Sequence, residues 1–180
     1  MFSGGMARLR KGVCYRSLES PYTRTSKYRK KSFIKTNYNA RVIKFVMGNL
    51  KKEDFNTNIK LKTKSDVQIR DNSLESARIT SNRLLEKELG IPNYFFRVSK
   101  YPYHILRNNP IASGAGADRF STGMKKSFGK PIGQAAQFKK GDTILELKLD
   151  KKNIEIGKKA LQRASYKISC GCSIVVTPSK

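Results

Sequence analysis

The feature that most limits how this chain can fold is a basic, glycine-rich stretch covering residues 111–131. Four glycines, four cations and a single acid punctuate it: Gly114, Gly116, Gly123 and Gly129; Arg119, Lys125, Lys126 and Lys130; and Asp118. No apolar period of two or 3.6 residues survives, so the stretch is not expected to bury one face as a helix or strand. Long irregular loops in compact domains are usually functional or disordered. We therefore interpret it as a flexible basic finger that becomes ordered on a phosphate-rich surface, the alternative being a solvated loop without a partner.

The net charge indicates the kind of partner. The chain has 180 residues, enough for one domain with a real core, and a formal net charge of +25. A field of this size makes affinity for polyanions hard to avoid. The sequence shows no apolar run that could span a bilayer, no secretory signal and no basic amphipathic helix with a bulky apolar face. We therefore expect nucleic acid, and not a membrane, as the partner.

The cysteines do not form a disulfide framework. There are three, Cys14, Cys170 and Cys172, and the last two are separated by one glycine. This usage predicts a reducing, cytoplasmic compartment. A zinc site that adds His104 to the three thiols is conceivable, but the usual spacing of zinc ligands is missing, and the alternative is three ordinary thiols.

Residues 1–37 are predicted to form a basic N-terminal arm. This segment holds ten cations and one acid, Glu19, and tyrosines lie between the cations. Aromatic rings can stack on unpaired bases while arginines bind phosphates. The alternative is a disordered basic tail that folds only on nucleic acid. Because Met6 is as good a start as Met1, we also expect translation to begin at Met6.

Residues 38–180 are predicted to form one α+β domain. Alternating or β-branched runs predict strands at residues 40–47, 59–63, 67–70, 94–98, 143–149 and 172–177. One helix is predicted to begin at the N-cap Asn72 and to end before Gly90, and a second to open at Asp150 or Asn153. This order favours a mixed or antiparallel sheet with two main helices over alternating βαβ units.

The first predicted helix has a core face and a cationic face. Apolar and small residues share one side: Leu74, Ala77, Ser81, Leu84, Leu85 and Leu89. Arg78 and Arg83 are expected on the other side, with Arg70 just before the helix. These three arginines are weaker candidates for contacts with RNA phosphates, since such a face is often only solvated.

Catalysis is not expected. Residues 123–130 superficially resemble a phosphate-binding P-loop, but five residues separate the glycines and Pro131 replaces the metal-binding hydroxyl. His104 is the only histidine and has no carboxylate near it in sequence. No nucleophile has a nearby base. We therefore expect no enzyme, no cofactor and no small-molecule substrate, and keep a degenerate P-loop protein and an architectural DNA-binding protein as rival interpretations.

Several short segments resemble one protein family in the same order. The most specific is Gly114-Ala115-Gly116-Ala117-Asp118-Arg119. The others lie at residues 47–49, 67–70, 82–90, 101–107, 123–124, 128–131 and 160–165. Together they resemble the large-subunit ribosomal proteins called L-sixteen in bacteria and L-ten-e in archaea and eukaryotes, and the archaeal-type branch most closely.

The resemblance implies a hammerhead-type α+β fold and a structural role in the large ribosomal subunit, in the cytoplasm. The implied partners are large-subunit rRNA, neighbouring large-subunit proteins and the acceptor region of tRNA near the aminoacyl site and the peptidyl-transferase centre. By position, the tRNA-proximal finger comprises Ser113, Gly114, Gly116, Asp118, Arg119, Lys125, Lys126, Gly129 and Lys130.

The expected mechanism is electrostatic and architectural. Arm and body cations would neutralise rRNA phosphates and release counterions, and the finger would supply cationic contacts near tRNA. The candidate rRNA-binding residues are Arg8, Arg10, Arg16, Arg24 and Lys30 in the arm and Arg70, Arg78 and Arg83 in the body.

Overall fold

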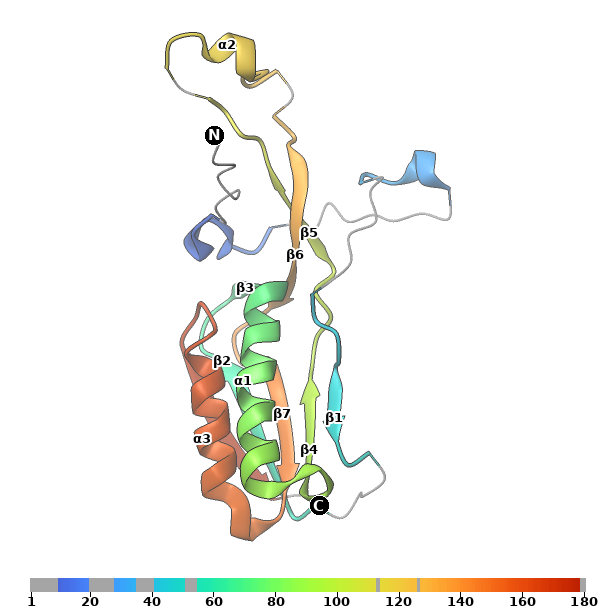
Figure 1. Cartoon of the computed structure of the whole chain (residues 1–180), viewed down its shortest axis with the longest axis vertical. Helices are drawn as coiled ribbons and strands as arrows, with labels where there is room; N and C mark the ends of the chain where they lie inside the picture. Colours follow the sequence, from blue (N-terminus) through green and yellow to red (C-terminus); the bar gives the residue numbers. More distant parts are fainter. Residues whose placement is uncertain are drawn as a thin grey trace, which may run out of the picture.

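The computed structural model describes residues 10–19, 28–34, 41–50, 55–112, 114–125 and 127–178. Figure 1 shows an elongated molecule in which two long helices cover a sheet at one end, while a narrow two-stranded ribbon carries the finger away from the other end. Four candidate residues, and both possible starts, lie outside the described residues: Arg8, Arg24, Ser113, Lys126, Met1 and Met6.

A five-stranded sheet forms the body. Its strands are β1 (Val46–Gly48), β2 (Thr57–Thr63), β4 (Tyr94–Val98), β7 (Thr143–Leu149) and β8 (Cys172–Pro178), in the order β1-β4-β7-β2-β8. Each neighbouring pair in this sheet is antiparallel. Strict alternation along β2 buries Thr57, Ile59, Leu61 and Thr63 and leaves the residues between them half-buried, as expected for a sheet covered on one face.

Two helices pack on the covered face: α1 (Asp71–Leu89) and α3 (Ile154–Ser165). The predicted core face of α1 is buried from Leu74 to Leu85, and Ser81 donates a hydrogen bond to the carbonyl of Ala160 at 3.1 Å. The helix begins at Asp71 with Arg70 as its N-cap, two residues before the predicted N-cap Asn72, and the Asp71 carboxylate accepts the backbone N–H of Asn72 at 2.8 Å. The second helix begins at Ile154, after a short 3-10 turn, η4 (Lys151–Asn153).

A second, three-stranded sheet supports the finger. Its strands are β3 (Val67–Arg70), β6 (Lys130–Phe138) and β5 (His104–Asn108), in the order β3-β6-β5, again antiparallel. The α+β class with two main helices is therefore confirmed, with two antiparallel sheets in place of one. Of the predicted strand at residues 40–47, the structure describes residues 41–47, and within these only Val46 and Met47 are strand, in β1.

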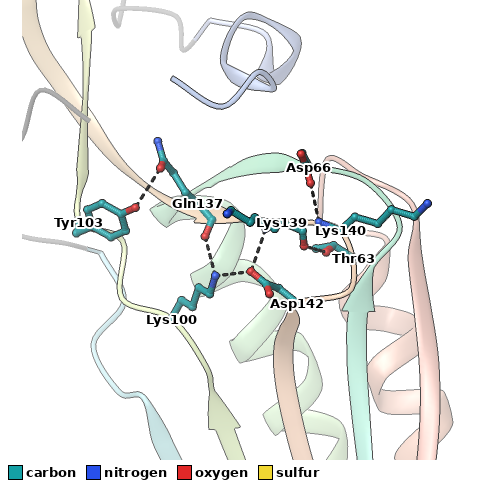
Figure 2. Close-up of polar contacts among 8 residues, drawn as sticks. All are labelled: Thr63, Asp66, Lys100, Tyr103, Gln137, Lys139, Lys140 and Asp142. Carbon is teal, nitrogen blue, oxygen red and sulfur yellow. Dashed lines mark hydrogen bonds and ion pairs between the residues drawn. The ribbon is translucent and has the colours of Figure 1, made fainter. Parts of the chain in front are cut away.

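The two sheets meet at a polar junction (Figure 2). The chain passes between them at four places: after β2, after β3 by way of α1, after β4 and after β6. Asp142 sits at the centre, where its carboxylate pairs with the ammonium of Lys100 and accepts the N–H of Lys139 at 2.9 Å. Thr63 donates its hydroxyl to the carbonyl of Lys139 at 2.7 Å, and Lys100 also donates to the carbonyl of Gln137 at 3.1 Å.

Further bonds close the junction on both sides. The carboxylate of Asp66 accepts the N–H of Lys140 at 2.7 Å, and the hydroxyl of Tyr103 donates to the side-chain oxygen of Gln137 at 3.0 Å. The hydrogen bonds from Lys100 and from the N–H of Lys139 hold the pKa of the Asp142 carboxyl below its usual range. The junction therefore favours the charged form of Asp142, and the part of its stabilisation that comes from Asp142 is present only while the carboxyl is charged.

We predict that Asp142→Asn lowers the free energy of unfolding by about 1 kcal/mol at neutral pH, since the lost ion pair is only partly exposed. Because the folded pKa of Asp142 is depressed, its contribution is present above the unfolded pKa, about 4, and is lost as pH falls through the folded pKa. Urea unfolding at several pH values should show the two proteins converging in acid. Glu88→Gln, which changes an exposed acid, is the control. A difference that persists unchanged below the folded pKa would contradict the assignment.

Candidate nucleic-acid interface

The base of the finger is held by a close backbone approach. Gly129 has a φ of +80°, and a Cβ there would lie 2.8 Å from the carbonyl carbon of Asn108 on the facing strand. Next to it, the guanidinium of Arg107 lies 4.0 Å from the centre of the Phe128 ring and donates to the carbonyl of Phe128 at 3.3 Å. The finger therefore leaves the β5–β6 ribbon in a defined direction.

The tip of the finger contains one turn of helix, α2 (Ala117–Phe120), at the far end of the ribbon in Figure 1. Residues 111–131 thus contain one helical turn and the start of β6 at Lys130, but none of the described residues among them is buried, in agreement with the expectation that the stretch buries no face. No residue of α2 is buried, so the turn needed no apolar face, only the left-handed Gly116 before it. Phe120 is 86% exposed, and Met124 is also exposed.

The finger presents cations without burying them. Arg119, Lys125 and Lys130 are exposed, and so is the acid Asp118 in the first turn of α2. Gly114, Gly116 and Gly123 have positive φ angles and open space where a Cβ would be. These residues shape a thin, charged projection that has room for an anionic partner on several sides.

Part of the predicted arm lies against the three-stranded sheet. Residues 10–19 include the 3-10 helix η1 (Gly12–Tyr15). Gln68 on β3 donates its N–H to the carbonyl of Arg16 at 3.2 Å and its side-chain amide to the carbonyl of Ser17. Gln137 on β6 donates to the carbonyl of Glu19 at 2.7 Å. The sequence analysis did not predict these contacts, because glutamines whose partners lie far along the chain leave no periodic pattern.

The arm places cations beside the base of the ribbon. Arg10 and Arg16 are exposed there, and Lys30, in the separate 3-10 helix η2 (Arg29–Lys31), is exposed as well. Arg70 is half-buried: it donates to the carbonyl of Arg10 at 2.8 Å, and its guanidinium lies 5.9 Å from the Tyr15 ring centre. Arg70 thus holds the arm in place, a role that the sequence analysis did not predict.

His104 lies under this part of the arm. It is buried at the start of β5 beside a hollow of about 220 Å³, which Arg10, Tyr15 and Arg107 also line. Burial lowers the pKa of its imidazole, with the nearby Arg107 acting in the same direction, so the ring is neutral at physiological pH. A neutral, buried ring does not serve as a phosphate-binding cation.

The arginines of α1 differ from one another. Arg83 is exposed, as predicted, but the expectation that Arg78 faces solvent is wrong. Arg78 is buried, forms a bidentate ion pair with Glu75 one turn earlier, and lies 3.1 Å from the sulfur of Met47. The pair with Glu75 raises the pKa of Arg78 and occupies its guanidinium, which makes it a structural residue of the helix–sheet interface.

The uncovered face of the five-stranded sheet carries cations that the sequence analysis missed. The antiparallel register aligns Lys60 on β2, Glu146 on β7 and Arg97 on β4 across this face. Lys62 and Lys148 point to the same side, where the ammonium of Lys148 lies 5.5 Å from the Phe95 ring centre. Glu146 pairs with Arg97 at 2.6 Å and accepts the Asn58 amide at 2.8 Å.

The charge balance on this face depends on Glu146. Burial alone would raise the pKa of its carboxyl, but the bonds from Asn58 and Arg97 hold the pKa below the usual range. The face therefore has four cations and one charged acid. Alternation along the single strands could have suggested it, but only the register shows that the cations gather.

The outer side of α3 is a second missed surface. Its exposed cations lie on and around the helix, with Glu155 as the nearby acid: Lys151, Lys152, Lys158, Lys159, Arg163 and Lys167. The buried stripe of this helix explains the segregation, since Gly157, Ala160, Leu161 and Ala164 take the inner side.

The structure gives little support to the rival sites. Lys130 begins the strand β6, whereas the lysine of a P-loop opens a helix. Within the described ranges, no group of three or more His, Cys, Asp or Glu side chains could hold a metal ion. In that same part of the chain, no helix is both long and apolar enough to cross a membrane.

Comparison with known proteins identifies the family. The family model described as "Ribosomal protein L16p/L10e" matches residues 23–175. Proteins named "Large ribosomal subunit protein uL16" are similar over nearly the whole chain. The one from Methanococcus maripaludis strain S2 is 41% identical over 172 residues, covering 96% of each chain. Those from Thermofilum pendens and Archaeoglobus fulgidus are each 43% identical, covering 93% and 90% of this chain and 96% and 89% of theirs. The resemblance seen in the sequence is thus confirmed, and the chain belongs to the ribosomal protein L16p/L10e family.

Proposed function

We propose that this chain is a structural constituent of the large ribosomal subunit, acting in the cytoplasm within ribosomes. In this role it binds large-subunit rRNA through its cationic surfaces, and its finger reaches the acceptor region of tRNA near the aminoacyl site and the peptidyl-transferase centre. The observation that carries the proposal is the outward placement of cations on separate faces of a chain with a net charge of +25. Its relatives' names as large-subunit proteins support the same assignment.

The distribution of charge fits a protein that is embedded in RNA. The open sheet face, the outer side of α3, the arm and the finger all present cations, while the apolar side chains are packed between the sheet and its helices. A protein that contacts one duplex needs one basic face. Cations on several sides suit a folded RNA that surrounds the protein, so the structure favours rRNA over the rival architectural DNA-binding role.

The finger fits a different task from the other surfaces. It stands away from the body on a two-stranded ribbon, and its tip combines exposed Arg119 and Lys125 with exposed Phe120. Cations suit the phosphates of a tRNA acceptor end, and an exposed ring suits its unpaired bases. Neighbouring large-subunit proteins are the remaining proposed partners.

Sucrose-gradient fractionation of a cell lysate at moderate and high salt tests the assignment. This chain should sediment with large subunits and translating ribosomes and survive a salt wash, as followed by mass spectrometry. Sedimentation with chromosomal DNA, or as a free protein, would overturn the proposal.

We predict that the open sheet face contributes to RNA affinity through phosphate contacts. If about eight phosphates are neutralised, log K for an rRNA fragment should fall with log salt at a slope of roughly −6 to −7. Replacing Lys60, Lys62 and Lys148 by Gln should make the slope shallower by about 2. The same change at the exposed Lys87, Lys139 and Lys140 is the control for lost charge alone. Equal effects of the two triple variants would show that net charge, and not this face, binds the RNA.

We predict that Arg119→Ala leaves folding intact but impairs translation. The side chain is exposed on α2, far from the core, so the melting temperature of the isolated chain should not change. Polysome profiles and growth should worsen, and Arg119→Lys, which keeps the charge, should restore part of the loss. Normal polysomes in the Ala variant would count against a role for this side chain.

We predict that Gly129→Ala misdirects the finger. The added Cβ would collide with the backbone of Asn108, and the alanine would have to adopt a backbone φ of +80°. Gly133→Ala is the matched control, because this glycine lies four residues later, within β6, and has no atom within 4 Å of the added Cβ. The Gly129 variant should assemble into large subunits yet translate poorly, while the Gly133 variant behaves as the wild type. Indistinguishable translation by the two variants would contradict a defined finger direction.

A further inference from the structure

We propose that Cys170 and Cys172 form a dithiol site that low-molecular-weight disulfides oxidise to an intrachain disulfide. The site lies at the bend between α3 and β8, on the body and away from the finger. It does not depend on the ribosomal role proposed above.

The geometry already brings the two sulfurs together. The Sγ atoms are 3.9 Å apart, and the Cys172 thiol also lies 3.5 Å from the carbonyl oxygen of Cys170. A disulfide needs sulfurs about 2.05 Å apart and Cα atoms about 4.4–6.8 Å apart. Residues separated by one other residue are at most about 7 Å apart, and the bend at Cys170 shortens this distance. Small rotations of two side chains are therefore enough to form the bond.

The backbone around the pair is fixed by the neighbouring strand. Cys172 begins β8 and pairs with Thr63 on β2, while the carbonyl of Gly171 accepts the N–H of Lys64 at 3.0 Å. Both cysteines are half-buried and pack against the core cluster. The two thiols are therefore held near one another and do not meet only by chance.

The two thiols are unequal, which suits a stepwise reaction. The hydrogen bond from Cys172 and the guanidinium of Arg16 lower the pKa of Cys170, whereas the same hydrogen bond and burial raise the pKa of Cys172. Cys170 also borders an open hollow of about 430 Å³, together with Arg16 and Gly171. Cys170 is thus the accessible nucleophile, and Cys172 is the thiol that resolves the intermediate.

The reaction balances in two exchanges. The Cys170 thiolate attacks one sulfur of a small disulfide RSSR, which forms a Cys170–SR bond and releases one thiolate RS⁻. Cys172 then loses its proton to solvent and attacks the Cys170 sulfur, which releases the second RS⁻. Two protein thiols are oxidised and one small disulfide is reduced to two thiols.

Cys14 provides a reference within the same molecule. It is an exposed free thiol on η1 and lines a different hollow, with His104. Trypsin should separate it from the pair, because Lys11 and Arg16 bound residues 12–16, while residues 168–180 follow Lys167 and carry both other cysteines.

The test is to incubate the reduced full chain with graded ratios of oxidised to reduced glutathione, alkylate it, digest it and analyse it by mass spectrometry. The peptide of residues 168–180 should lose two hydrogens and resist alkylation at an oxidant ratio at least about tenfold below that which half-modifies Cys14, because the second thiol acts intramolecularly. Cys172→Ser should instead retain a glutathione adduct on Cys170, and Cys170→Ser should react at least about tenfold more slowly than the wild type.

Two results would overturn the proposal: both cysteines of the peptide still alkylated where Cys14 is half-modified, or a disulfide that joins the peptide to Cys14 or to a second chain. Circular dichroism checks that the variants are folded. If a variant is unfolded, the proposal is judged from the wild-type peptide map, because Cys14 is an internal reference thiol in the same sample.

Discussion

The ion pair between Lys100 and Asp142 lies at the junction of the two sheets. The two sheets share no strand, and four chain segments pass between them; the junction in Figure 2 joins three of these, which follow β2, β4 and β6. Asp142 follows β6, Lys100 follows β4, and Thr63 ends β2. Val67, Ile69, Ala136 and Phe138 of the second sheet belong to the same apolar core as the five-stranded sheet and its helices. Hydrophobic packing and the polar contacts of the junction therefore act together to hold the ribbon against the body.

The charged groups also fall into two sets. Three buried or half-buried acids form ion pairs with nearby cations: Glu75 with Arg78, Glu146 with Arg97, and Asp142 with Lys100. The cations of the open sheet face, α3 and the finger have far fewer acids near them. In isolation these surfaces repel one another and lower the stability of the compact state. Binding a polyanion removes that repulsion, so RNA affinity and folding stability are linked in this chain.

Periodicity predicted the body well because its elements bury one face. The strands β2, β3, β4, β7 and β8 and both long helices follow from alternation or a 3.6-residue stripe. Periodicity did not predict β6, because its residues from Lys130 to Phe138 include proline, glycine and two glutamines. This strand is stabilised by pairing with β3 on one side and β5 on the other. It also misplaced Arg78, since a charged residue is buried only if a partner such as Glu75 is within reach. The sheet-face cations could not be found, because register between distant strands is not a local property.

The finger was found from composition and from its family motif, but composition did not show that its two ends behave differently. At the base, Gly129 and the stacked pair of Arg107 and Phe128 leave little freedom. At the tip, α2 buries nothing, and the preceding glycines have open space around them. The rigid base and the unpacked tip have different consequences for binding. The base restricts the volume that the tip can reach, which lowers the entropy lost on binding, and the tip can still adjust its cations to the anionic surface that it meets.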